Sequence, residues 1–152
     1  MSILEQRAAI VAQARKWIGT PYVSCASVLG AGVDCGRLLV RVFVDSGLVP
    51  PFDAGQYSPE WNQHNSEERY LAFVTDRAGP VPVDAAEPGD VILWKYAHCF
   101  AHGGIVTCAN PLTIIHAYQP DGLVIEEQVK HNARLGDPSR ERRAYSIWAK
   151  KT

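Results

Sequence analysis

Cys35 stands at the predicted start of a helix, where a thiol has reason to be reactive. Asp34 is a good N-cap, because its carboxylate can accept from the free N–H groups of the next turn. The apolar residues between Leu38 and Phe43 recur at helical spacing and predict one buried face. A helix N-terminus favours an anion, so we expect the pKa of Cys35 to lie below the ordinary thiol value of about 8.5. The alternative is a small buried cysteine. The capped position favours a nucleophile.

A thiolate nucleophile needs a neighbouring base and a third group that orients this base. Five histidines are available, and His102 and His116 fall on two successive predicted strands. Their numbers differ by an even amount, so a regular hairpin with an even loop would turn them to opposite faces. We therefore predict an odd loop or a β-bulge between Gly103 and Ile115. Asn110-Pro111 is the favoured place, because proline cannot donate to the ladder.

Other residues near these histidines leave alternatives open. Gly103 is expected to leave room for a substrate backbone to approach. His98 competes with His102 for the role of base, whereas His64 and His131 are expected to be surface residues. Taken alone, His102 or His116 would be more typical of a partly buried polar residue whose hydrogen bonds are made within the protein than of a catalytic group.

Five short motifs occur together in an order that resembles the NlpC-type papain-like cell-wall cysteine peptidases. They are Gly19-Thr20-Pro21-Tyr22-Val23, Asp34-Cys35, Pro88-Gly89-Asp90-Val91-Ile92, His102-Gly103-Gly104-Ile105-Val106 and Ile115-His116-Ala117. Each motif is weak alone, but the resemblance runs from Trp17 to about Val129. It implies Cys35 as nucleophile, His102 as base, His116 as its orienting group and Tyr22 as a hydroxyl near the oxyanion.

The resemblance also implies a substrate. Members of this family cleave the peptide stems of peptidoglycan, typically between γ-D-glutamate and the diamino acid. The segments Tyr57-Ser58-Pro59-Glu60-Trp61 and Ser66-Glu67-Glu68-Arg69-Tyr70 further resemble the subset encoded with phage tail genes. Other phage tail proteins are therefore expected partners beside the peptidoglycan peptide.

Four residues are expected to contact the substrate: Asp34, Arg37, Trp61 and Gly103. Arg37 departs from the family, which usually has glycine there; it could attract a substrate carboxylate, point into solvent or obstruct the groove. Trp61 lies in a stretch rich in Pro, Gly and aromatic residues. Such a loop could line a groove or merely cover the core.

The elements that must position these residues change character along the chain. Helices are predicted over Ile3–Ile18, from Asp34 onward, and from Asn65 or Ser66 to Gly79, the first with a face of Leu4, Ala8, Val11 and Ile18. Five strands are predicted at 90–96, 103–108, 113–118, 123–129 and 144–149, with a loop at 130–143. This order predicts a single α+β domain over 1–152, papain-like, with N-terminal helices packed on a small antiparallel sheet.

Composition narrows the classes of function. The formal net charge is −1, which gives no electrostatic footprint for nucleic acid or for an anionic membrane surface. No run approaches the ~20 apolar residues of a membrane span, and the four cysteines show no zinc-ligand spacing. We expect no metal and no organic cofactor.

The N-terminal residues show no secretory signal. We therefore expect synthesis in the cytoplasm and carriage to the cell wall in a virion or tail. Two alternatives remain: an amidase or acyltransferase that uses the same Cys-His site, and a non-enzymatic tail protein with a decayed site.

Overall fold

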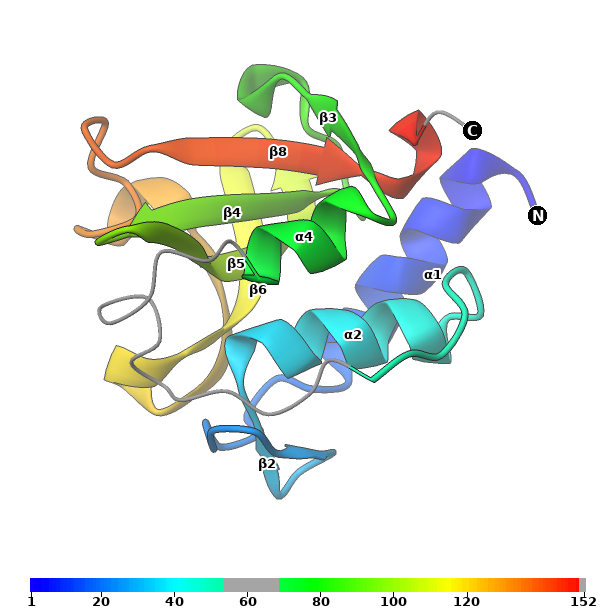
Figure 1. The fold of residues 1–152 in the computed structure, drawn as a ribbon, viewed down its shortest axis with the longest axis horizontal. Helices are drawn as coiled ribbons and strands as arrows, with labels where there is room; N and C mark the ends of the chain where they lie inside the picture. The colour runs from blue at the N-terminus through cyan, green and yellow to red at the C-terminus, as the bar shows by residue number, and fades with distance from the viewer. Residues whose placement is uncertain (54–68, 151–152) are drawn as a thin grey trace.

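The computed structural model describes residues 1–53 and 69–150 as helices packed on an antiparallel sheet (Figure 1). The helices are α1 (Ile3–Arg15), α2 (Cys35–Asp45) and α4 (Arg69–Thr75). The strands are β1 (Ser27–Val28), β2 (Gly32–Val33), β3 (Gly79–Val81), β4 (Val91–Tyr96), β5 (Cys99–Ala109), β6 (Leu112–Tyr118), β7 (Leu123–Gln128) and β8 (Arg142–Ser146). The predicted α+β class is confirmed.

Within the described residues, β3 to β8 form one sheet with the strand order β3-β8-β4-β5-β6-β7, and every pair is antiparallel. The sequence predicted five of these six strands. It missed β3, because Gly79-Pro80 was expected only to end the preceding helix. It also started the last strand, β8, two residues late and ended it three residues late. The small β1–β2 sheet precedes α2, and Figure 1 shows β2 below the N-terminal end of that helix.

The two faces of the sheet bury different partners. Alternate residues such as Leu93, Ile105 and Ile115 pack against the helices, as predicted. Their neighbours Trp94, Val106 and Ile114 pack on the other face against Val129 and Leu135. The segment predicted as a loop at 130–143 therefore covers the second face, and the indole N–H of Trp94 donates to the Leu135 carbonyl at 3.1 Å.

Of the face predicted for helix α1, only Val11 is buried. Ile10, Ala14 and Trp17 are buried, whereas Leu4 is 78% exposed and Ile18 is 44% exposed. The buried positions still follow the helical spacing i, i+4 and i+7.

Helix α2 begins as predicted. Asp34 is its N-cap, with extended backbone angles, and accepts from the backbone N–H of Arg37 at 2.9 Å. Its buried side consists of Cys35, Leu38, Leu39, Val42 and Phe43. The cap and the apolar face together place Cys35 at the edge of the core.

The hairpin between β5 and β6 has the predicted bulge, but at a different residue. Ala109 pairs with Leu112, so the loop is the two residues Asn110-Pro111. The register shifts between Val106 and Cys108, which makes Thr107 the extra residue. The Thr107 hydroxyl donates to the Thr113 carbonyl at 3.4 Å, which gives the bulge a local partner. The favoured position at Asn110-Pro111 was wrong.

A second bulge lies on the other side of β5. Trp94 pairs with His102 and Lys95 with Phe100, which leaves Ala101 as the extra residue. This bulge re-aims the backbone immediately before His102.

Candidate active site

The thiol of Cys35 lies against the start of β5. Its Sγ donates to the carbonyl oxygen of Ala101, the residue before His102, at 3.5 Å. The Tyr70 hydroxyl of α4 donates to the Cys35 carbonyl at 3.1 Å and so holds the first turn of α2 from the other side. Cys35 is 8% exposed, so it is almost fully buried.

His102 and His116 are in direct contact, as the parity argument required. The Nε2 of His102 lies 2.8 Å from the Nδ1 of His116. Gly104 makes this approach possible, since a Cβ there would lie 2.8 Å from Ile114 Cδ1 and 3.4 Å from His116 Cβ. His102 is 7% exposed and His116 is fully buried. His98, by contrast, is exposed on the β4–β5 turn.

The predicted fall in the Cys35 pKa is wrong for this resting structure. The pKa of Cys35 is raised to about 12, chiefly by burial and also by the neighbouring Asp34 carboxylate. Hydrogen bonds from the Tyr22 hydroxyl and from the Gly36 N–H act in the opposite direction but are weaker. Loss of water around the sulfur therefore outweighs the favourable end of the helix. The resting site contains a thiol, which needs a base at the moment of attack.

Both histidines are neutral for a related reason. Burial lowers the pKa of His102 well below its usual 6.5, and the adjacent His116 lowers it further. Burial also lowers the pKa of His116, although the hydrogen bond and charge of Glu127 oppose this shift. A neutral imidazole can accept a proton, so the pair is in the form that base catalysis requires.

Tyr22 lies beside the thiol, as the resemblance implied. Burial raises the pKa of Tyr22, and the neighbouring Cys35 and Asp34 raise it further. The Tyr22 hydroxyl donates to the Cys35 side chain and accepts from the Cys35 backbone N–H. A hydroxyl and a backbone N–H thus lie beside the thiol, bonded to each other at rest, and both are donors of the kind that stabilise an oxyanion.

Two of the four residues expected to contact the substrate, Asp34 and Gly103, contact other residues of the protein instead. The Asp34 carboxylate is 1% exposed and accepts from the Arg37 N–H at 2.9 Å and from the Cys25 N–H at 2.7 Å. A Cβ on Gly103 would lie 2.7 Å from the Tyr70 hydroxyl oxygen and 2.8 Å from Leu93 Cδ2. Asp34 is therefore a helix cap, and Gly103 admits Tyr70 rather than a substrate backbone.

The other two have different outcomes. The Arg37 side chain is half-buried on the first turn of α2, and its backbone N–H is part of the cap. Trp61 lies outside the described residues, as do Tyr57, His64 and the expected helix start at Asn65 or Ser66. Their predicted contribution to a groove stays a prediction.

The motif Pro88-Gly89-Asp90 is structural. Asp90 is 1% exposed, forms an ion pair with Arg7 of α1 at 2.9 Å and accepts from the Glu87 N–H at 2.9 Å. Arg7 also stacks over the Trp148 ring, 4.2 Å from its centroid. These contacts hold α1 against the start of β4, which gives the motif a structural role.

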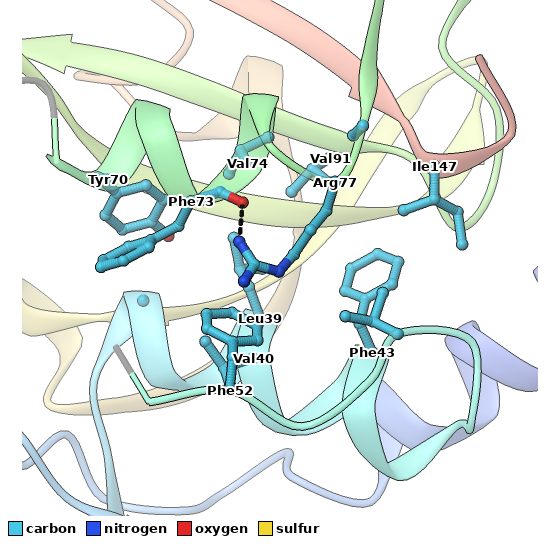
Figure 2. A pocket seen from close by; sticks show the side chains of 13 residues that line it. Leu39, Val40, Phe43, Phe52, Tyr70, Phe73, Val74, Arg77, Val91 and Ile147 are labelled. Atoms are coloured by element: carbon cyan, nitrogen blue, oxygen red, sulfur yellow. Dashed lines mark hydrogen bonds between the residues drawn. The ribbon is translucent and has the colours of Figure 1, made fainter. Parts of the chain in front are cut away.

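An apolar pocket of about 70 Å³ lies between α2 and α4 (Figure 2). Leu39 and Phe43 line it from α2, and Phe73 lines it from α4. Figure 2 shows the Arg77 side chain reaching across to the Phe73 carbonyl, to which it donates at 2.9 Å, and its guanidinium also lies 3.4 Å from the centroid of the Phe52 ring. Cys35, His102 and His116 are not among the described residues that line this pocket.

Two residues of the site were missed in the sequence. Glu127 on β7 lies 2.7 Å from the Nε2 of His116, and Tyr70 holds the Cys35 carbonyl. A signal existed for Glu127, because a hairpin closed by residues 119–122 pairs His116 with Ile125. Glu127, two residues further along β7, then faces the same side as His116.

The buried histidines predict that the protein loses stability in mild acid. The unfolded chain binds protons below about pH 6.5, whereas the folded chain resists them until its lower pKa values are reached. The effect is absent above pH 7. Below pH 6.5 the free energy of unfolding should fall, with a limiting slope of about 1.4 kcal/mol per pH unit for a histidine whose folded pKa lies well below 6.5, as that of His102 does.

Urea unfolding at pH 7, 6 and 5 measures this slope. His102→Gln should reduce it, and the matched control His98→Gln, at an exposed histidine, should leave it unchanged. Equal slopes in all three proteins would show that His102 is not a neutral buried group.

The described residues contain no group of three His, Cys, Asp or Glu side chains that could hold a metal ion. None of the described helices is long and apolar enough to cross a membrane.

Comparison with known proteins finds similarity in structure rather than in sequence. No protein-family model matches the chain, and no curated protein matches it. The NlpC/p60 domain of the peptidoglycan hydrolase SagA is similar with a TM-score of 0.64 and 26% identity, over 92% of this chain and 97% of that domain.

Two other solved structures are similar at lower identity. The peptidoglycan hydrolase RipB from Mycobacterium tuberculosis has a TM-score of 0.61 and 17% identity, over 95% of this chain and 65% of that one. An N-acetylmuramoyl-L-alanine amidase from Bacteroides uniformis has a TM-score of 0.58 and 15% identity, over 93% of this chain and 98% of that one. The chain therefore has the papain-like fold of the NlpC/p60 peptidoglycan hydrolase domains.

Proposed function

We propose that this protein is an NlpC-type cysteine hydrolase that cleaves the peptide stems of peptidoglycan. The carrying observation is the contact of 2.8 Å between His102 and His116, on the strand against which the Cys35 thiol lies. A nucleophile, a neutral base and an orienting group thus come from α2, β5 and β6. The similarity to peptidoglycan hydrolase domains supports the substrate class.

The first chemical step needs a base because the resting thiol is neutral. His102 takes the proton from Cys35 Sγ as the sulfur attacks the amide carbonyl carbon. The resulting oxyanion accepts from the Cys35 backbone N–H and the Tyr22 hydroxyl, once the hydrogen bond between these two groups opens. The buried surroundings strengthen both hydrogen bonds, since little water competes for them.

The second half returns the enzyme to its resting state. The imidazolium of His102 gives its proton to the leaving amine as the C–N bond breaks, which leaves a thioester on Cys35. Water then loses a proton to His102 and attacks the thioester carbonyl. The carboxylic acid leaves, and Cys35 regains its proton from His102.

We propose the bond between γ-D-glutamate and the diamino acid as the scissile bond, on the resemblance of the motifs around Cys35, His102 and His116. A second candidate is the amide between N-acetylmuramic acid and L-alanine. The similarity to an N-acetylmuramoyl-L-alanine amidase favours that alternative. Both reactions use the same thiol and imidazoles.

Digestion of purified muropeptides, followed by mass analysis, separates the two. An endopeptidase should release fragments that begin with the diamino acid and leave L-alanine attached to the sugar. An amidase should release the whole stem instead. The digestion should proceed equally with and without EDTA, because the proposed chemistry uses a thiol. Loss on chelation with recovery on zinc would overturn the mechanism.

The phage-tail context is also a proposal, supported by the sequence resemblance of segments 57–61 and 66–70. Such a protein would be carried to the cell wall in a virion and would act there during entry. Mass analysis of purified virions from a producing strain tests whether the chain is a component of the particle.

A further inference from the structure

The hydrogen-bond chain that begins at His102 continues beyond His116. The Nε2 of His116 lies 2.7 Å from Oε2 of Glu127, on β7. The Glu127 side chain is 21% exposed, whereas that of His116 is fully buried. A carboxylate at the edge of the core thus touches the second histidine on the side opposite His102.

We infer that Glu127 is a positioning residue that fixes the tautomers of both histidines and thereby leaves Nδ1 of His102 as the proton acceptor. This inference rests on the proposed function of His102. An ionised carboxylate only accepts hydrogen bonds, so the Nε2 of His116 must carry a proton. A neutral imidazole carries one N–H, and the Nδ1 of His116 must then accept.

The same argument carries to His102. Its Nε2 faces the accepting Nδ1 of His116 at 2.8 Å and must therefore donate. The neutral His102 ring then has its lone pair on Nδ1, the only ring nitrogen left to take the thiol proton. Without an acceptor at position 127, His116 can hold its proton on Nδ1 instead. The proton on His102 would then move to Nδ1, and the base would be blocked.

Glu127 is itself held in place. The Nδ2 of Asn132 donates to Oε2 of Glu127 at 3.1 Å. The orientation of this amide is fixed, because its Oδ1 accepts from the backbone N–H groups of Leu135 at 3.0 Å and Arg134 at 3.1 Å. Asn132 thus presents only donors to Glu127. An oxygen is required at this point whichever residue supplies it.

The surroundings of His116 leave Glu127 as the group that decides the tautomer. The Tyr118 ring stacks on the imidazole with centroids 4.8 Å apart and occupies its face. Asp121 is the other acidic residue whose charge raises the His116 pKa, and it acts at longer range than the hydrogen bond. The edge of the ring meets His102 at one nitrogen and Glu127 at the other.

Two substitutions separate the acceptor from the charge. Glu127→Met keeps the length but removes the acceptor, and kcat should fall by about 10–100-fold with little change in KM. Glu127→Gln removes the charge, but Asn132 forces its oxygen toward His116, so its loss should be clearly smaller. Glu126→Met is the matched control, because Glu126 pairs with Arg15 on the opposite face of β7, and its kinetics should be unchanged.

Nitrogen NMR of the imidazoles gives a readout that a structural role would not move and that needs no substrate. The unsubstituted protein should show His116 and His102 both protonated on Nε2. Glu127→Met should shift both toward Nδ1, and Glu127→Gln should not. An Nδ1-protonated His116 in the unsubstituted protein would overturn the inference, even if the protein hydrolyses muropeptides. The expected NMR pattern in a protein that does not hydrolyse muropeptides would contradict the proposed function and leave the inference about Glu127 standing.

A second variant covers the case in which Glu127→Met does not fold. Combining Glu127→Gln with Asn132→Asp replaces the forced donor by an acceptor, so the Gln amide turns and donates toward His116. Size is conserved, but the tautomers should reverse, and kcat should fall below that of Glu127→Gln alone. Equal kcat values and equal tautomers in these two proteins would show that position 127 does not set the tautomer.

Discussion

Replacing Cys35 by alanine is expected to abolish muropeptide hydrolysis, with a loss of kcat on the order of 10⁶-fold, as removal of the nucleophile of another hydrolase causes. The proposed reaction passes through a thioester on this sulfur, and none of the described rings around His102 (Trp94, Tyr96, His116 and Tyr118) supplies a comparable nucleophile. The measurement is the initial rate of fragment release from purified muropeptides, followed by mass analysis.

Cys108→Ala is the matched control, because its thiol is exposed on β5 beyond the bulge. It should retain full activity. Hydrolysis by Cys35→Ala at a rate near that of the unsubstituted protein would remove Cys35 from the mechanism. An unsubstituted protein that binds the wall but cleaves nothing would favour a tail protein with a decayed site.

The histidines should differ in effect. His102→Ala removes the group that moves the proton in both halves of the reaction, and general acid–base catalysis contributes roughly 10²–10⁴-fold. His116→Ala removes the partner that orients His102, so we expect a smaller loss, about 10–100-fold. His98→Ala should have no effect, because that side chain is exposed on the β4–β5 turn.

Urea unfolding of each variant at pH 7 separates catalytic loss from loss of the fold, since both active-site histidines are buried. An inactive His98→Ala beside an active His102→Ala would show that the base was assigned to the wrong histidine. Equal losses for His102→Ala and His116→Ala would mean that the two rings act as one unit rather than as base and positioner.

The sequence alone determined the features that depend on local rules. Asp34 followed by a helical apolar stripe is enough to predict a capped helix with Cys35 on its first turn, and that helix is present. Alternation of residues is enough to show that His102 and His116 can share a face of a hairpin only if an odd loop or a bulge intervenes, and a bulge is present. Both arguments use only the periodicity of side chains along a helix or along the strands of a hairpin, so they hold before any contact between distant segments is known.

The tertiary structure decided what depends on packing between distant segments. It placed the bulge at Thr107 rather than at Asn110-Pro111, and it buried Ile10 and Ala14 of α1 in place of the predicted Leu4 and Ile18. It also reversed the sign of the Cys35 pKa shift. A helix end acts through its own peptide groups, whereas desolvation is set by every segment that covers the sulfur, and the sequence does not state which ones do.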